Sequence, residues 1–476
     1  MAPRETTLGT VVKKADVFSR AVPFRITNPE RIPAQRYYDP EFFKLESELF
    51  WPRVWQMACR LEEITKIGDW VEYKILDKSV ILIHTNKGVK AFHNACRHRG
   101  VKLLSGYGTC REQGITCPFH GWHWNIDGQN TFVFGRHLFS QENLEAGELN
   151  LAPCRVEFWG GCAFINFDPD APPLLQCLSP VAARLDPRMV DKLRVEWWHS
   201  AILPVNWKLA MEAFMEGYHV MRTHPQLQQA NLPGYDSYTR PVGPEYTAEL
   251  ASFNVKQLVQ MSLNYNTILS EGMAGMVHAS DLEIGRDIAD HLKLPEDPQA
   301  GIMEWYRVWN DEITRRNRAR GVPFPDLNEL IIKHPAAPVQ FIFPHYFLLP
   351  MFGNMSSYRI RPLGPETCLF EIWSLILYPE GEQRPRPLAP QPMAHDDPRF
   401  PPIPQQDYSN LPLQQLGLHC GGFEYMRLSR KVEGMISNYQ RTLDGFLSGV
   451  PRDSLVTAMQ VASGELDDPI KDIGFQ

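Results

Sequence analysis

Two short clusters of cysteine and histidine are the clearest chemical feature of this chain. The first is Cys96-Arg97-His98, and the second, after an 18-residue spacer, is Cys117-Pro118-Phe119-His120. Thiolate sulfur and imidazole nitrogen are ligands that proteins use for iron, copper and zinc. Because each cluster supplies one of each, together they offer two sulfur and two nitrogen ligands to one metal group.

This ligand set predicts a Rieske-type [2Fe–2S] cluster, in which two thiolates hold one iron and two histidines hold the other. A structural zinc site is the alternative, since Zn²⁺ also accepts two cysteines and two histidines. Zinc signatures usually pair like with like, so the mixed clusters here favour iron. Glycines follow both clusters, where the backbone has to turn close to the metal. The predicted ligands of this electron relay are Cys96, His98, Cys117 and His120.

A predicted helix further along the chain carries a second group of possible ligands. If this helix were straight, Glu212, Glu216 and His219 would share one face, and His224 would point about half a turn away. Pro225 disfavours the helical conformation of the residue before it. Both imidazoles can therefore meet one metal ion if the helix is deformed or ends at His224.

His219 and His224 match two thirds of a known iron site. Non-heme Fe(II) oxygenases use two histidines and one carboxylate on one face of the metal and leave positions open for dioxygen and substrate. Taken alone, such a histidine pair on an amphipathic helix is more often structural. The predicted [2Fe–2S] cluster favours a metal site at these two histidines, because an electron relay in a chain of this size needs an acceptor for its electron. The third ligand then has to come from elsewhere.

Composition predicts an ordinary globular protein of two to three domains, with 476 residues, 43% of them hydrophobic and 22% charged. A net charge of −7 without a Lys/Arg run argues against nucleic-acid partners. The N-terminus lacks a signal-peptide core and no 18-residue apolar run occurs, so we expect a cytoplasmic protein without membrane spans. Nine scattered cysteines indicate reduced thiols rather than a disulfide framework.

The pattern of apolar residues predicts an α+β fold in three parts. Residues 1–44 read as an arm leading into a short helix, residues 45–168 as a small β-sandwich with both Cys–His clusters in its loops, and residues 169–476 as a catalytic domain that combines helices with an antiparallel sheet. In the last part we predict strands at 356–360 and 369–377, helices at 204–232, 282–320 and 423–448, and a proline-rich loop at 379–404.

With both patterns in view, the chain resembles the catalytic α subunit of the Rieske non-heme iron oxygenases, the ring-hydroxylating dioxygenase and monooxygenase family. The resemblance extends over residues 45–448. It is carried by the four cluster residues and by Asn206-Trp207-Lys208 leading into Glu212-x-Phe214-x-Glu216-x-Tyr218-His219-x4-His224. It implies a helix-grip, START-like catalytic domain, one Rieske cluster and one mononuclear Fe(II) per chain.

The resemblance also implies that the third iron ligand is an aspartate far downstream. Asp407 is the best match, because the segment Gln406–Asn410 is similar to the D-x-x-N segment that precedes a helix in the family. Asp396 and Asp397 are rivals, although a solvated loop explains both of them better.

In the family, an acid on the iron helix links a cluster histidine of one subunit to an iron histidine of the next subunit of a trimer. By position this acid is Glu216, and its partner on the cluster side is His120. A carboxylate between two imidazole N–H groups would fix their tautomers and shorten the electron path. Glutamate is a departure, because many members have aspartate here, and it occurs in relatives that act on quaternary amines. An exposed helix acid is the alternative interpretation of Glu216.

The resemblance implies a terminal oxygenase that receives electrons from a separate NAD(P)H-dependent reductase, possibly through a ferredoxin. The chain itself lacks a glycine-rich dinucleotide fingerprint. We expect a homotrimer and a hydrophobic, aromatic or polycyclic substrate, because the candidate pocket walls are apolar, although residues of this kind are more often core. These walls are Phe214, Met215, Met221, Phe341, Phe343, Tyr346, Phe347, Leu348, Met351 and Phe352.

Three alternative functions stay open at this point. The first is oxidative N- or O-demethylation of an amine or a methoxy compound, which needs the same iron. The second is a Rieske electron carrier or ligand-binding protein without mononuclear iron. The third is a zinc-stabilised interaction module, which would be colourless, whereas a [2Fe–2S] protein absorbs visible light.

Overall fold

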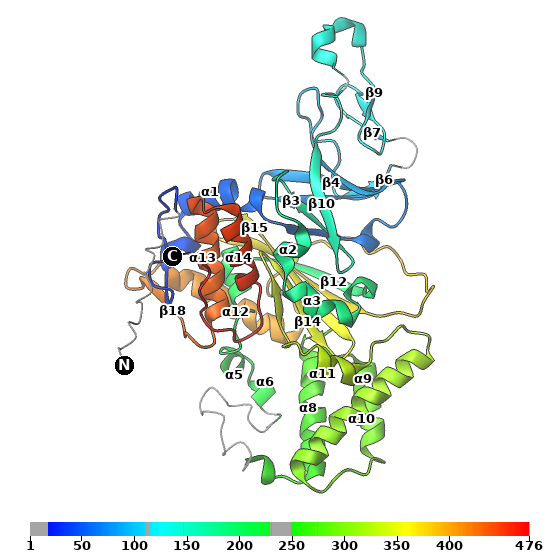
Figure 1. Cartoon of the computed structure of the whole chain (residues 1–476), viewed down its shortest axis with the longest axis vertical. Coiled ribbons are helices and arrows are strands. Elements are labelled where there is room, and N and C mark those ends of the chain that lie inside the picture. The colour runs from blue at the N-terminus through cyan, green and yellow to red at the C-terminus, as the bar shows by residue number, and fades with distance from the viewer. Residues whose placement is uncertain are drawn as a thin grey trace, which may run out of the picture.

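Two large sheets organise the fold, and the computed structural model places one above the other (Figure 1). The structure describes residues 18–110, 114–145, 147–228, 230, 249–273 and 275–475. The predicted α+β class with antiparallel sheets is confirmed. No described helix combines the length and the apolar composition that a membrane span requires.

The upper sheet has seven strands, and all neighbouring strands pair antiparallel. Across the sheet they are β2 (Gln56–Arg60), β11 (Cys162–Asn166), β10 (Pro153–Trp159), β5 (Gly88–His93), β4 (Lys78–Thr85), β3 (Asp69–Ile75) and β6 (Tyr107–Thr109). A small sheet of β7 (Ile115–Thr116), β8 (His123–Trp124) and β9 (Asn130–Phe132) projects above it (Figure 1).

Strand β4 separates two apolar cores. Val80 and Leu82 belong to the main core, whereas Ile81 and Ile83 belong to a second core around the projecting sheet. Successive side chains of a strand point to opposite faces, so this continuous apolar run is covered on both sides. The projecting sheet therefore rests on a core of its own.

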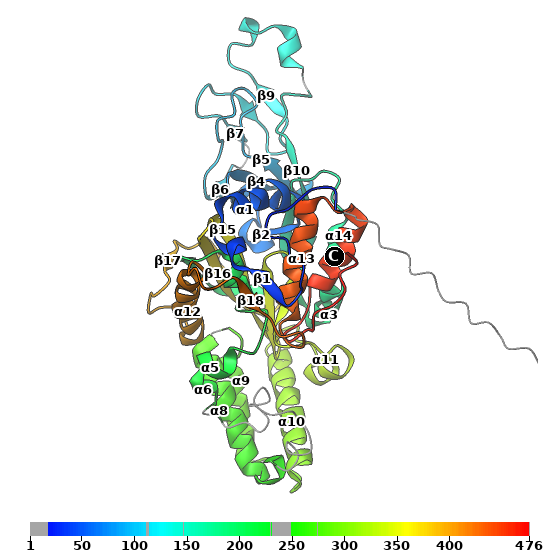
Figure 2. The same cartoon turned by 90° about the vertical axis from the view of Figure 1, so that its left-hand side faces the viewer.

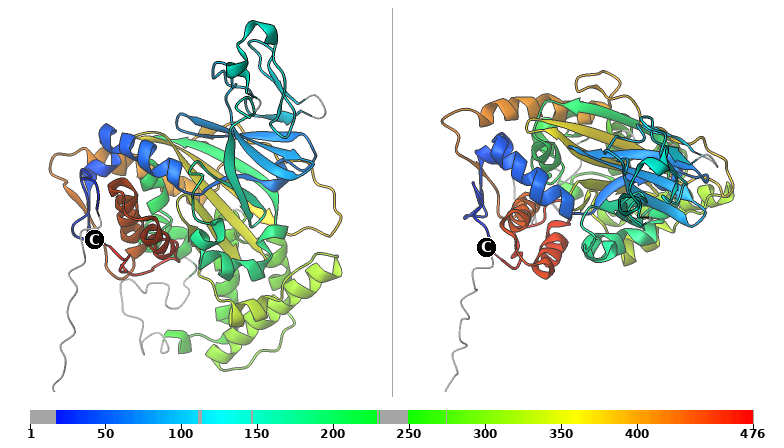
Figure 3. Two further views of the ribbon diagram at one scale, coloured as in Figure 1. Left: turned by 45° about the horizontal axis from the view of Figure 1, so that its top comes forward. Right: turned by 90° about the horizontal axis from the view of Figure 1, so that it is seen from above.

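The lower sheet has six strands, of which only the short edge pair β12–β17 is parallel. Across the sheet they are β13 (Gln340–Ile342), β14 (Tyr346–Met351), β15 (Asn354–Gly364), β16 (Thr367–Ile376), β12 (Arg194–Leu203) and β17 (Met393–Ala394). Helix α13 (Gly434–Ser448) is buried along its whole length. Seen from above, α1 (Pro40–Leu45) lies between α12 (Pro402–Leu418) and α13 (Figure 3).

Helices form the lower end of the molecule, where α8 and α10 run side by side (Figure 2). Asp297 caps α10 by accepting a hydrogen bond from Ala300 N, and Pro298 occupies its first turn. Trp305 and Trp309 are fully buried. The helices here are α8 (Val255–Met273), α9 (Ala279–Ala289), α10 (Pro298–Ala319) and α11 (Leu327–Lys333).

The continuous helix predicted at 204–232 is wrong. The chain forms α4 (Trp207–Glu212), a turn, and then two short helices, α5 (Val220–Thr223) and α6 (Pro225–Gln228), while residues 231–232 lie outside the described residues. The helix ends because Phe214 N and Met215 N bond to carbonyls three residues back, which tightens the last turn. Apolar spacing continues through this break, so the sequence pattern did not reveal it.

The other predicted elements agree with the structure in their centres and differ at their ends. The strands at 356–360 and 369–377 lie within β15 and β16, and the region 282–320 contains most of α9 and all of α10. The helix predicted to end the chain begins only at Gly434, after the short strand β18 (Tyr425–Arg427), and α14 (Arg452–Ala462) follows it. Two further helices, α2 (Leu174–Leu178) and α3 (Val181–Leu185), lead into β12.

Buried hydrogen bonds join the two sheets. Arg359 on β15 donates to the carbonyls of Met57 and Ala58 on β2 while its guanidinium pairs with Glu371 at 2.7 Å. The long loop before α12 adds a second link, because Arg386 donates to the carbonyl of Trp70 on β3 at 2.9 Å. The upper sheet is therefore fixed against the lower sheet of its own chain.

The N-terminal segment is built into the lower half of the molecule. Strand β1 (Arg31–Pro33) pairs with β18, and Arg36 forms a buried ion pair with Asp444 on α13 at 2.5 Å. The segment also supplies Glu46, which pairs with Lys208 on α4 at 2.5 Å with both side chains fully buried. It thus braces α4 and α13 at the same time.

Replacement of Lys208 by methionine tests this brace. Leaving Glu46 charged and unpaired in the interior costs about 3–5 kcal/mol of unfolding free energy. We therefore expect a clearly lower midpoint of unfolding in urea, and partial recovery when Glu46 is also replaced by leucine. The control is Lys333→Met, which removes an exposed pair with Glu329 and should leave the midpoint unchanged. Equal midpoints for the two lysine variants would contradict the brace.

Candidate metal centres

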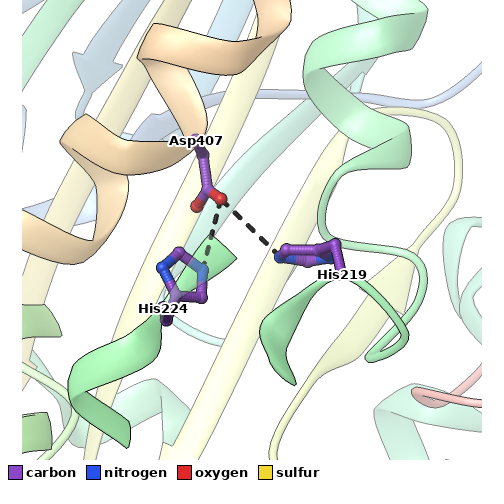
Figure 4. Close-up of side chains that lie close together, drawn as sticks. All are labelled: His219, His224 and Asp407. Atoms are coloured by element: carbon purple, nitrogen blue, oxygen red, sulfur yellow. Dashed lines mark ion pairs between the residues drawn. The ribbon is translucent and has the colours of Figure 1, made fainter. Parts of the chain in front are cut away.

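His219, His224 and Asp407 converge on one point (Figure 4). Asp407 Oδ1 lies 3.6 Å from His219 Nε2 and 3.3 Å from His224 Nε2, and all three candidate ligand atoms lie within 4.8 Å of one another. Metal bonds to imidazole nitrogen and carboxylate oxygen are about 2.0–2.2 Å long, so two donors on one ion lie at most about 4.4 Å apart. The spacing of both histidines from Asp407 fits a single transition-metal ion.

Glu216 orients His219. Its Oε1 lies 2.7 Å from His219 Nδ1, and its Oε2 accepts a hydrogen bond from the backbone N of the same residue at 2.9 Å. Burial alone would lower the pKa of His219, but the Glu216 and Asp407 carboxylates outweigh it and raise that pKa above its ordinary value. With Nδ1 donating to Glu216, the Nε2 lone pair is free to face Asp407.

His224 lies where α5 ends, with φ −117° and ψ 70°. Pro225 disfavours helical geometry at the residue before it, which agrees with this departure. The ring is buried, and its Nδ1 lies 2.6 Å from Gln406 Oε1. Two histidines that a straight helix would direct apart are thus brought together from the two ends of a four-residue helix.

The resemblance places Asp407 before a helix, but in the structure Asp407 lies within α12. Helix α12 starts earlier than expected because Pro401 and Pro402 favour the backbone conformation of a helix N-terminus. The rival Asp397 pairs with Arg399 at 2.6 Å, and that guanidinium lowers its pKa to about 2. Neither Asp396 nor Asp397 joins the histidines.

The two Cys–His clusters form matching loops. In the first loop, Gly100 N donates to the carbonyl of Cys96, and Cys96 N donates to the carbonyl of Val101. In the second loop, Gly121 N donates to the carbonyl of Cys117, and Cys117 N donates to the carbonyl of Trp122. Gly100 and Gly121 have φ of 73° and 69°, a left-handed conformation that favours glycine. Such a pair of turns brings two thiols and two imidazoles to one tip of the projecting sheet.

The cluster residues are close together at that tip. The rings of His98 and His120 have centroids 4.8 Å apart, and His98 stacks on Trp122 at 4.8 Å. Burial raises the pKa of the Cys96 thiol, and the neighbouring Cys117 adds to that rise. Two buried thiols and two adjacent imidazoles are the donor set that a Rieske cluster requires. All nine cysteines are free of disulfides.

The segment Asn206-Trp207-Lys208 anchors α4 to three parts of the fold. Asn206 donates its side-chain amide to the carbonyl of Pro365 and its backbone N–H to Gln415 on α12. Trp207 Nε1 donates to Glu46, the partner of Lys208. Each residue of this motif thus holds the helix that precedes the two candidate ligands His219 and His224.

Glu212, which has no assigned role in the sequence pattern, is held by two buried hydrogen bonds. Tyr37 donates to it at 2.9 Å and Gln440 Nε2 at 2.5 Å. The sequence pattern also did not predict a role for Gln406, which contacts His224, or for Gln226, which donates a hydrogen bond to Gln406. Only the position of Gln406 next to Asp407 could have drawn attention to it.

A cavity of about 370 Å³ opens beside His219. Its acidic side chains outnumber its basic ones: they are Glu212, Glu216, Asp407 and Glu433, against Arg427. None of the apolar residues predicted as pocket walls lines it, and the side chain of Met221 lies outside the described residues. Most of those residues, such as Phe341 and Phe347, are buried in the core of the lower sheet, as their apolar character also allows.

Comparisons with known families agree with both centres. Residues 190–449, more than half of the chain, match the family described as "Ring hydroxylating alpha subunit (catalytic domain)". Residues 54–133 match the "Rieske [2Fe-2S] domain". These are the domains that hold a mononuclear iron and a Rieske cluster in the family, which confirms the predicted cofactors.

Curated relatives include both monooxygenase and dioxygenase subunits. The carnitine monooxygenase oxygenase subunit of Escherichia coli (strain K12) is 32% identical over 205 residues, 42% of this chain and 54% of that protein. The glycine betaine monooxygenase oxygenase subunit of Chromohalobacter salexigens is 29% identical over 211 residues, 44% of this chain and 46% of that one. The anthranilate 1,2-dioxygenase large subunit of Acinetobacter baylyi is 32% identical over 201 residues, 41% and 42% of the two chains. The matches thus span about half the length of these relatives.

Solved structures share the fold over most of the chain. A quaternary ammonium Rieske monooxygenase with L-carnitine bound has a TM-score of 0.55 and 18% identity, covering 88% of this chain and 97% of that one. Naphthalene 1,2-dioxygenase with indole in its active site has a TM-score of 0.60 and 18% identity, covering 94% and 100%. At this identity the likeness establishes the fold alone.

The pH dependence of stability tests the buried position of Glu212. Burial raises its pKa from 4.5 to about 7, against the hydrogen bonds from Gln440 and Tyr37. A carboxyl with a raised pKa binds its proton more tightly in the folded state, so its contribution to stability falls as pH rises from about 4.5 to 7 and is constant above that. Relative to wild type, Glu212→Gln should gain up to about 3 kcal/mol of unfolding free energy between pH 5 and pH 8. Urea titrations at four pH values measure it, and parallel pH profiles would refute it.

Proposed function

The chain belongs to the ring-hydroxylating alpha subunit family, and on that premise we propose that it is a terminal oxygenase that hydroxylates a methylated or quaternary amine. The observation that carries the proposal is the convergence of two histidines and one aspartate in a chain that also has two matching Cys–His loops. When bound, the cluster supplies single electrons and the mononuclear iron activates dioxygen beside the substrate.

The side chains have distinct proposed roles. Those that hold the iron are His219, His224 and Asp407, and those that hold the cluster are Cys96, His98, Cys117 and His120. Glu216 keeps His219 in the tautomer whose Nε2 is available and accepts a second imidazole N–H from a neighbouring subunit. Asp407 also neutralises part of the positive charge of the bound metal.

The amine substrate is proposed from the relatives. The sequence favoured an aromatic ring, but the carnitine and glycine betaine monooxygenase subunits favour the alternative of amine oxidation. Glutamate at position 216 agrees with this alternative.

The proposed reaction inserts one oxygen atom into a C–H bond next to nitrogen. It consumes one dioxygen, two electrons and two protons, and the second oxygen atom leaves as water. The product, a carbon bearing both hydroxyl and nitrogen, breaks its C–N bond to give an aldehyde and a free amine. A separate reductase supplies the electrons, since the sequence has no dinucleotide fingerprint.

A homotrimer is proposed because one chain cannot bring its own centres together. The Cys–His loops belong to the part of the chain that projects at the top of the molecule, whereas α5 and α12, which carry the histidines and the aspartate, lie below the upper sheet (Figure 1). Large apolar side chains are exposed on the projecting tip, among them Phe119 at 57%, Phe134 at 65% and Leu138 at 76%. We propose that this tip docks into the cavity beside His219 of a neighbouring copy.

Product analysis tests the proposed reaction. Purified protein with a generic Rieske-oxygenase reductase, NADH and a panel of quaternary amines and aromatic acids should release an aldehyde and an amine from one of the amines. His219→Ala should form no product and hold two irons per chain instead of three, and His291→Ala, which changes an exposed histidine, should match wild type. Gain of two oxygen atoms by a ring substrate, with no amine turned over, would overturn the amine proposal.

Glu216→Gln tests the proposed bridge between subunits. Glutamine replaces one of the two acceptor oxygens by an NH₂ donor and carries no charge, so it cannot offer a separate acceptor oxygen to each of two imidazoles. We expect unchanged iron content and unchanged chemical reduction of the cluster, with turnover lowered by about 10–100-fold. Glu329→Gln, the same change at an exposed position on α11, is the matched control and should keep near wild-type turnover. Full turnover by Glu216→Gln would exclude the bridge.

A further inference from the structure

His224 has an orienting partner of a different chemical kind from that of His219. Its Nδ1 lies 2.6 Å from the side-chain oxygen of Gln406, a neutral amide, whereas His219 Nδ1 faces the Glu216 carboxylate. Its Nε2 lies 3.3 Å from Asp407 Oδ1 and points toward the carboxylate in Figure 4. The two ring nitrogens of this buried histidine thus have separate tasks.

The amide oxygen decides where the ring carries its proton. A neutral imidazole has one N–H and one lone pair, and only the lone pair can bind a metal. Gln406 Oε1 carries no hydrogen, so the contact is a hydrogen bond only if His224 Nδ1 is the donor. This tautomer leaves Nε2 unprotonated toward the metal site.

A lone glutamine would not fix this choice, because its amide can rotate and present its NH₂ group instead. The structure supplies a lock in Gln226, the second residue of α6. Gln226 Nε2 donates to Gln406 Oε1 at 2.8 Å, and Gln406 Nε2 donates to Gln226 Oε1 at 3.0 Å. If the Gln406 amide alone rotated, its NH₂ group would face the NH₂ group of Gln226 and its oxygen would face the oxygen of Gln226, so both hydrogen bonds would be lost.

We infer that Gln406, locked by Gln226, is a positioning residue that selects the metal-binding tautomer of His224. Asp407 and Gln406 are neighbours on α12, so one helix delivers both a ligand and the group that orients another ligand. Gln226 follows Pro225, so the break that turns His224 inward also places the lock. The inference rests on the proposed role of His224 as an iron ligand.

Cobalt(II) binding to protein that keeps its Rieske cluster but has lost its mononuclear iron tests the inference. Gln406→Leu should weaken cobalt binding by about 10–100-fold. Gln406→Glu keeps an acceptor oxygen and should bind at least as tightly as wild type. Gln260→Leu, the same change at an exposed position on α8, is the control and should have no effect.

Proton NMR of the cobalt form gives a readout that a merely structural role would not move. The wild type should show two exchangeable, strongly shifted ring N–H signals, one from each iron-site histidine. Gln406→Leu should lose or broaden one of them, and Gln406→Glu should keep both. Two unchanged signals together with unchanged cobalt affinity in Gln406→Leu would overturn the inference.

Further variants separate this inference from the proposed metal site. If wild type binds no cobalt, or if His224→Ala binds it equally well, the metal site itself is refuted and the inference with it. If His224→Ala loses binding while Gln406→Leu does not, only the inference is refuted. Should Gln406→Leu not fold, Gln226→Leu removes the lock alone: weaker cobalt binding supports the inference, and wild-type binding overturns it.

Discussion

Two side chains five positions apart cannot face one ion from a straight helix, and the backbone around His219 and His224 departs from helical geometry so that both face the candidate metal site. The chain leaves helical geometry after α4, restarts at His219 under the Glu216 carboxylate, and ends the next helix at His224 because proline follows. Each break costs backbone hydrogen bonds, which side chains or tight turns replace. The helix ends are therefore part of the site.

Such a broken segment needs support from elsewhere, and the N-terminal segment gives it. Buried groups from this segment hold the start of α4 through Lys208 and its end through Glu212, while Arg36 ties the same segment to α13. A buried ion pair is costly to break by removing one partner, so these pairs favour the arrangement in which both partners meet. Rigidity at α4 lets the following turn be irregular.

The sequence predicted those parts of the candidate sites whose residues are close together in the chain. Cysteine and histidine within three or four positions predict a cluster loop from local chemistry, and Pro225 predicts the bend at His224. Asp407 needed the family resemblance, because nothing around it marks an aspartate as a ligand. Contacts between distant segments, such as Tyr37 with Glu212 or Gln406 with Gln226, could not be read from periodicity. The break after α4 could not be predicted either, because buried apolar residues continue through it. The domain boundaries near 44 and 168 stay predictions.

The order of the candidate ligands along the chain also determines the order in which they emerge during translation. All four cluster residues and the strands that carry them precede residue 170, whereas Asp407 follows near the C-terminus. Domains generally fold in order of emergence from the ribosome. A nascent chain can thus form its cluster domain early, whereas the proposed iron site stays without its third ligand until Asp407 has emerged from the ribosome.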